Sequence, residues 1–166
     1  MATAQQISVD EYLHTSFEYD AEYVEGRIVQ RPLPQKNHSR MQSWLIRALH
    51  AAGRQFGYRV WPEQRIRTQH QPARFRIPDV CVTEGDPNVE VFTTPPFLCV
   101  EVFSPDESTG ELQRKIGEYL SFGVAYVWVI DPASQHGEIH TPDGIERIDS
   151  GHFTAGPIEV DLKEID

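Results

Sequence analysis

The stretches "RFRIPDVCVT" (residues 74–83) and "PFLCVEVFSP" (residues 96–105) each have the pattern of a strand in which one carboxylate interrupts an apolar run. Side chains alternate along a strand, so Asp79 and Glu101 each point to the same side as apolar neighbours. If the two strands pair, the two carboxylates lie close together on one face of a sheet. The pair therefore marks a candidate site as well as the core of the fold.

Two ionised carboxylates on a largely apolar face cost several kcal/mol unless a shared proton, a basic partner or a metal ion compensates them. Mg²⁺ suits the arrangement, because one or two carboxylates hold it while water and substrate phosphate fill its other positions. Two alternatives stay open. Either acid could lie at a strand end in solvent, or it could pair with an arginine such as Arg76.

The patterns on both sides of these strands predict a mixed-sheet α/β domain. Apolar residues at helical spacing, with capping residues, predict helices at 8–13, 38–56 and 107–122. Alternating runs predict a small hairpin or a bent strand over 22–30, strands at 58–69, 75–84, 97–103 and 125–131, and short antiparallel strands over 137–162. The strand, helix, strand succession from 97 to 131 implies a parallel right-handed crossover.

The chain length predicts one domain, because 166 residues can bury a single core and are too few for two ordinary domains. We expect a single unit over residues 1–166. Within it, residues 1–35 form an N-terminal helix and hairpin, residues 38–131 the core, and residues 132–166 the C-terminal antiparallel strands.

The formal net charge of −10 argues at first against a nucleic-acid partner, since phosphate binding depends on Lys and Arg. The charge is strongly segregated, however. Residues 27–76 hold eleven Lys or Arg and one acid, a charge of +10, and the rest of the chain carries −20. Such segregation indicates a basic face on an acidic body, or else simply a solvated surface.

Several classes of protein are disfavoured. No stretch approaches the roughly 20 apolar residues of a membrane span, and "MATAQQISVDEYL" has no features of a secretory leader, so we expect a soluble, cytoplasmic protein. Cys81 and Cys99 lie in apolar runs and are expected to be buried thiols. The histidines lack a His-Glu-x-x-His spacing, so zinc is not expected.

The motifs "YVEGRIV", His38, "IPDV", "VEVFSP", Lys115, Tyr119 and "GVAYVWVIDP" occur in an order and spacing that together are specific. Across nearly the whole chain the sequence resembles the Uma family, which belongs to the restriction-endonuclease-like, PD-(D/E)XK superfamily. The resemblance implies a mixed-sheet core of order α-β-β-β-α-β, flanked by the N-terminal helix and hairpin and the C-terminal strands. It also implies a metal-dependent phosphodiesterase.

The resemblance assigns Asp79 and Glu101 as ligands of Mg²⁺ or Mn²⁺. Glu25 matches the family's N-terminal "EG" acid, and would supply a third carboxylate or hold a metal-bound water. His38, at the start of a helix, could contact phosphate or could be a simple helix-start histidine.

The superfamily lysine is missing from its usual place, because the position two residues after Glu101 is Phe103. Uma-type sequences carry a lysine on the following helix, here Lys115, and that residue is expected to act in catalysis. Lys115 lies beside the apolar stripe, so its long stem could cross to the sheet. The alternative is a solvated lysine that pairs with Glu111 one turn earlier.

The function implied is hydrolysis of nucleic-acid phosphodiester bonds, with DNA as the expected substrate, by a metal-bound water. A homodimer is expected, because two sites related by a two-fold axis can cut two strands. Two alternatives are a catalytically silent nucleic-acid-binding or oligomerisation module and a metal-free small-molecule hydrolase. The expected phosphate contacts are His38, Arg40, Arg65, Arg67, Arg74 and Arg76.

Overall fold

The computed structural model describes residues 6–166; residues 1–5, the start of the predicted N-terminal region, lie outside it. Its main sheet has the strand order β10-β9-β8-β7-β6-β3 within the described residues. Strands β7 and β8 are parallel and the other pairs are antiparallel, so the sheet is mixed as predicted. The strands are β3 (Tyr58–Pro62), β6 (Val80–Glu84), β7 (Leu98–Val102), β8 (Tyr126–Ile130), β9 (Gly137–Thr141) and β10 (Gly144–Ile148).

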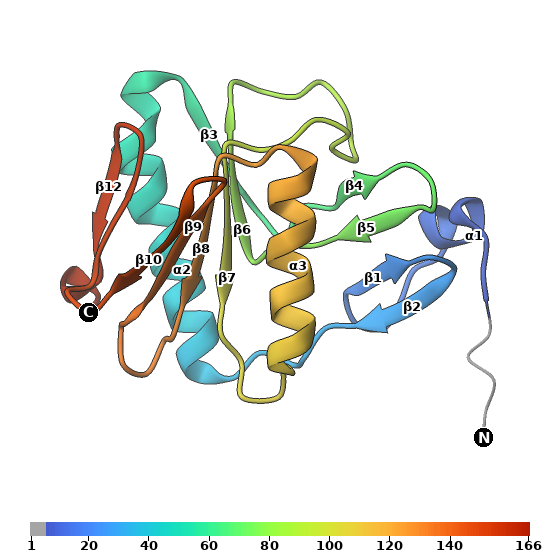
Figure 1. Cartoon of the computed structure of the whole chain (residues 1–166), viewed down its shortest axis with the longest axis horizontal. Helices are drawn as coiled ribbons and strands as arrows, with labels where there is room; N and C mark the ends of the chain where they lie inside the picture. Colours follow the sequence, from blue (N-terminus) through green and yellow to red (C-terminus); the bar gives the residue numbers. More distant parts are fainter. Residues whose placement is uncertain (1–5) are drawn as a thin grey trace.

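A second sheet extends from the side of the main one and carries the N-terminal hairpin (Figure 1). Its order is β2-β1-β5-β4 in the described chain, with helix α1 (Val9–His14) beside it. The hairpin predicted over residues 1–35 thus shares a sheet with part of the predicted core. These strands are β1 (Ala21–Val24), β2 (Arg27–Gln30), β4 (Ile66–Gln69) and β5 (Arg74–Arg76).

Two predicted strands are each broken into two in the structure. The run 58–69 divides into β3 and β4, and the run 75–84 into β5 and β6, so each run serves both sheets. Pro78 has no N–H to donate to a ladder. Glu63 has a φ of +48°, and its N–H donates to the carbonyl of Asp79 at 3.2 Å. The predicted continuous strands were therefore wrong, and Asp79 lies at the junction of the sheets.

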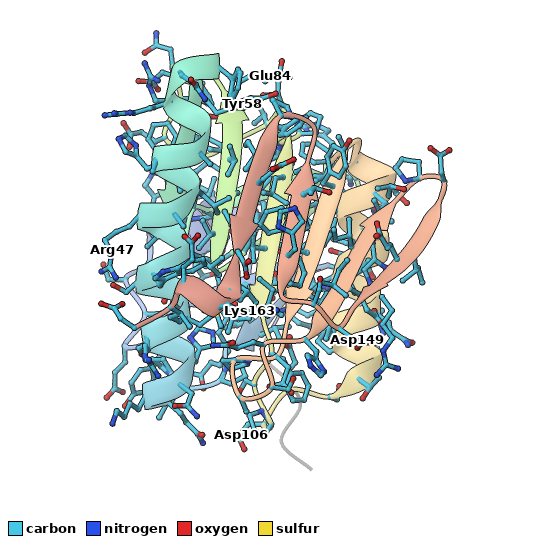
Figure 2. All side chains as sticks on the ribbon, turned by 90° about the vertical axis from the view of Figure 1, so that its left-hand side faces the viewer. Arg47, Tyr58, Glu84, Asp106, Asp149 and Lys163 are labelled. Atoms are coloured by element: carbon cyan, nitrogen blue, oxygen red, sulfur yellow. The ribbon has the colours of Figure 1, made fainter. Side chains whose placement is uncertain are left out.

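Helices α2 (Lys36–Gly53) and α3 (Thr109–Phe122) cover opposite faces of the main sheet (Figure 2). Helix α3 begins where Ser108 Oγ accepts the N–H of Glu111, and it ends at Gly123, whose φ of +114° favours glycine. It connects the parallel strands β7 and β8, so the parallel crossover that was predicted is confirmed. Helix α2 is followed by a short 3₁₀ turn, η1 (Arg54–Phe56).

The two faces of the main sheet bury different residues. Val80, Val100 and Trp128 pack toward α2 and the C-terminal hairpin of β11 (His152–Ala155) and β12 (Ile158–Asp161), which is followed by the 3₁₀ turn η2 (Leu162–Glu164). Cys81 and Cys99 pack toward α3 as free buried thiols. The predicted α/β class is confirmed. None of the helices in residues 6–166 is both long and apolar enough to span a membrane.

Candidate active site

Strand register brings Asp79 and Glu101 together. In the antiparallel pair of β6 and β7, Val80 lies opposite Val100 and Cys81 opposite Cys99. One step further along, the backbone N–H of Val102 donates to Asp79 Oδ2 at 2.7 Å. Both carboxylates are only 2% exposed. The expectation from alternation, that the two acids share one site, is confirmed, and neither acid lies in solvent.

Asp79 is held by two basic side chains. Arg31, at the end of β2, donates to Asp79 Oδ1, and His38 Nε2 on α2 lies 3.2 Å from the same oxygen. Burial alone would raise the pKa of Asp79, but His38, Arg31 and the Val102 N–H together lower it. Asp79 is therefore ionised. Its basic partner is Arg31, and not Arg76 as the sequence allowed.

Glu101 has fewer basic partners for its negative charge than Asp79 has. Its Oε1 accepts the hydroxyl of Tyr119 at 2.7 Å, and its Oε2 lies 3.9 Å from Lys115 Nζ. Burial raises the pKa of Glu101 to about 7; the negative charges of Asp79 and Glu22 also raise it, and Lys115 opposes them. An added cation beside Glu101 would favour its ionised form.

Lys115 points from α3 toward the sheet. Its Nζ lies 2.6 Å from Glu107, 3.9 Å from Glu22 and 3.9 Å from Glu101. Burial alone would lower the pKa of Lys115, but these three carboxylates raise it above its ordinary value. The ammonium is therefore charged and lies beside Glu101, as expected if the long stem of Lys115 crosses to the sheet. The pairing with Glu111 is not formed.

Glu22 supplies the third carboxylate near Lys115. It is fully buried in β1, where Oε1 accepts the N–H of Ile77 at 2.9 Å and Oε2 lies 3.0 Å from Arg76 Nη1. The structure does not bring Glu25 to this cluster. Glu25 occupies the β1–β2 turn with a φ of +52°, and it pairs with Arg74 at 2.5 Å. The catalytic role predicted for Glu25 has no support from this geometry.

The arginines predicted to contact phosphate are engaged elsewhere in the fold. Arg76 is 1% exposed and binds Glu22, Glu111 and Glu118, so it is not available to a ligand. The other four lie outside the cavity described next, within the described part of the chain. Arg40 donates to the Asp166 carbonyl, Arg65 and Arg67 stack on Tyr12 and Phe75, and Arg74 binds Glu25 and Glu118.

The site opens into a cavity of about 320 Å³, here called the acid pocket. A hard cation fits its chemistry, because Asp79 and Glu101 are buried oxygen donors and Mg²⁺ needs only one or two protein carboxylates. No cluster of three side chains at metal-ligand spacing is found in residues 6–166. Water and substrate would therefore complete the coordination. The ionisable residues of its lining are Glu18, Asp20, Glu63, Asp79, Glu101 and Glu107, with Arg31, His38 and Lys115.

A family model described as "Uma2: Putative restriction endonuclease" matches residues 9–158, which is most of the chain. The chain belongs to this family. A search of curated proteins finds no match. Among solved structures, a "putative nuclease belonging to DUF820 from Anabaena variabilis ATCC 29413" superposes with a TM-score of 0.82 at 26% identity. The match covers 96% of this chain and 97% of the other.

Membership in the Uma2 family confirms the resemblance and the nuclease-like fold. Glu22, Arg31 and Glu107 are among the site residues that were missed in the sequence. Glu22 had a usable signal, since it lies between Ala21 and Tyr23 in the kind of apolar run that drew attention to Asp79 and Glu101. Arg31 had none, because its partner Asp79 lies 48 residues away in the sequence.

Proposed function

We propose that this Uma2-family protein is a Mg²⁺- or Mn²⁺-dependent endonuclease that hydrolyses phosphodiester bonds in nucleic acid, with DNA as the substrate. The observation that supports this most strongly is that the buried carboxylates Asp79 and Glu101 line the acid pocket together, with Lys115 Nζ 3.9 Å from Glu101. Perturbed carboxyl groups in a cleft are typical of catalytic sites. The nuclease family gives the reaction class.

Asp79 and Glu101 would hold the cation. When bound, a divalent ion lowers the pKa of its water and neutralises charge on the phosphoryl group. Lys115 is charged and buried near Glu101, so it can stabilise negative charge that develops at the reacting centre. Arg31 and His38 contact Asp79 Oδ1 and line the same pocket, which places them to bind the substrate phosphate.

Cleavage of supercoiled plasmid and of a single-stranded oligonucleotide at low salt tests the proposal. We expect product with Mg²⁺ or Mn²⁺ and none with chelator. Asp79→Ala and Glu101→Ala should each abolish product. Exposed acids serve as matched controls: Asp106→Ala and Glu84→Ala should cut at the wild-type rate. Figure 2 shows these two residues at opposite ends of the molecule.

The outcomes separate the candidate functions. Metal-dependent cleavage that survives both site substitutions would contradict the assignment of the site. A wild-type protein that binds metal but cuts neither substrate would favour the silent nucleic-acid-binding module. The contact between Arg31 and Asp79 gives that second candidate a structural basis, because the arginine already occupies the oxygen that a cation would need. Cleavage that persists in chelator would contradict metal dependence itself.

A further inference from the structure

A second cavity of about 270 Å³ adjoins the acid pocket. His38 and Ser104 line both spaces, so the two cavities share a wall. Pockets for drug-sized ligands have volumes of roughly 300–1,000 Å³, so this one suits a smaller, ring-sized group. Its position makes it a place for the part of a substrate next to the reacting phosphate.

The shared wall contains a polar atom without a partner. Nδ1 of His38 is buried and makes no hydrogen bond within the described residues. Buried polar atoms are nearly always paired, so such an atom indicates a missing ligand or water. The other ring nitrogen, Nε2, faces Asp79 in the acid pocket. Nδ1 therefore points away from Asp79, and because almost none of its surface is accessible, His38 lines the second cavity through other atoms of its side chain or backbone.

The remaining walls combine flat apolar surfaces with amides. Its apolar residues are Phe103, Pro105, Pro132 and Ala133, Gln35 and Asn37 are exposed amides at the start of α2, and Asp131 adds one carboxylate, whose oxygens accept hydrogen bonds from Ala133 and Ser134. Unstacked nucleobases are bound by stacking on aromatic side chains and by hydrogen bonds to their edges. Amide side chains offer both a donor and an acceptor for those edges.

We propose that the second cavity binds the nucleobase adjacent to the phosphate that occupies the acid pocket. This rests on the proposed function, because it takes the acid pocket as the phosphate site. Phe103 stacks on the base, and Asn37 reads its edge. A base inside a cavity cannot remain in a duplex stack, so the favoured substrate is single-stranded or carries an unpaired base.

Binding of fluorescent single-stranded oligonucleotides of equal length, one with natural bases and one with abasic sites throughout, tests the proposal. The assay uses low salt with Ca²⁺ in place of Mg²⁺, because Ca²⁺ also takes oxygen ligands. Wild type should bind the natural strand about tenfold more tightly or better, since stacking contributes about 1–3 kcal/mol per base. Asn37→Ala and Phe103→Leu should each reduce this ratio severalfold.

Asn88→Ala is the matched control, because Asn88 is an exposed asparagine remote from both cavities. It should keep the wild-type ratio, and melting curves show that each variant is folded. Equal binding of the two strands by wild type, failure to bind either, or a ratio that both cavity variants leave intact would overturn the proposal. Cleavage that does not depend on the bases would overturn the base-binding role of the second cavity and leave the proposed nuclease activity standing. Base-dependent binding without cleavage would support it and overturn only the nuclease activity.

Discussion

Glu22, Glu101 and Glu107 all face the ammonium group of Lys115, and Glu22 also pairs with Arg76, so the single charge of Lys115 serves both Glu101 and Glu107. Arg31 neutralises Asp79 nearby, but it leaves this imbalance in place. A buried charge without full compensation is costly, and a divalent cation is the group that would restore the balance. The electrostatics of individual residues therefore favour a cation site as much as the fold does.

Replacement of Lys115 should impair both catalysis and stability. We expect Lys115→Met to reduce the cleavage rate about 10²-fold or more, because an electrostatic donor to the reacting centre is lost. The melting temperature should also fall, since the carboxylates lose their cation. Single-turnover rates and melting curves measure the two effects. Lys163→Met is the control, since Lys163 is exposed in the C-terminal region (Figure 2); equal effects of both variants would contradict the assignment.

Glu101 should make the metal-free protein less stable as pH rises. Its pKa is raised from 4.5 to about 7, mainly by burial, so the folded protein binds the extra proton. The free energy of unfolding should therefore fall between about pH 4.5 and 7, by about 3 kcal/mol for a shift of this size. The lowered pKa of Asp79 has the opposite effect on the free energy of unfolding, and it acts only at pH values below the ordinary pKa of 3.8.

Glu101→Gln should remove this fall, and urea unfolding in chelator at pH 5 and pH 8 measures it. Glu84→Gln, at an exposed position, should keep the wild-type dependence. If the stability of wild type and Glu101→Gln changes equally between the two pH values, Glu101 does not titrate as described.

At the scale of elements, buried Arg76 ties the second sheet to α3. From β5 it reaches Glu22 on β1 at 3.0 Å, and Glu111 and Glu118 on α3 at 2.6 and 2.7 Å. Arg76 is thus a shared ion-pair partner for Glu22 on the second sheet and for Glu111 and Glu118 on α3. The network also fixes the orientation of Glu22, whose other oxygen accepts the N–H of Ile77.

Arg76→Met should lower the free energy of unfolding by about 3–5 kcal/mol, because it leaves buried glutamates without their partner. Arg147→Met should change it by less than about 0.5 kcal/mol, since Arg147 is 78% exposed. Urea denaturation of both variants gives the comparison. A loss below about 1 kcal/mol for Arg76→Met would show that the network contributes little.

The sequence predicted those helices and strands that are marked by residues close together in the chain. The Ser8 cap, the glycine that ends α3, and the alternation that pairs Asp79 with Glu101 can all be recognised within a few residues. The division of two apolar runs between two sheets could not be, because a run keeps its alternation while its partners change. The same limit hid Arg31, whose burial depends on distant strands.

For the whole molecule, the charge segregation in the sequence does not place Arg40, Arg65, Arg67, Arg74 or Arg76 in the acid pocket. Most arginines of residues 27–76 that were expected to bind phosphate pair with acids or stack on aromatic rings inside the fold. The acid pocket is lined mainly by carboxylates. Nucleic-acid binding by this chain should therefore depend more on a bound cation than on a basic surface.

We expect the protein to form a homodimer through β10. This strand is one of the two outer strands of the main sheet in the described chain, and its Ile145 is 68% exposed. An open edge with an exposed apolar residue favours pairing with a second copy. Light scattering at micromolar concentration should give the mass of a dimer, and Ile145→Lys should give that of a monomer. A monomeric wild type would contradict the expectation.

Direct titration with Mn²⁺ by calorimetry tests the central claim, that Asp79 and Glu101 hold a divalent cation. Wild type at pH 8 should bind Mn²⁺ and release heat, whereas Asp79→Asn and Glu101→Gln should each weaken binding at least about tenfold, the effect of 1.4 kcal/mol. Glu84→Gln should bind as wild type does. Equal Mn²⁺ affinity in all four proteins, or no binding by wild type, would contradict a cation site at these two carboxylates.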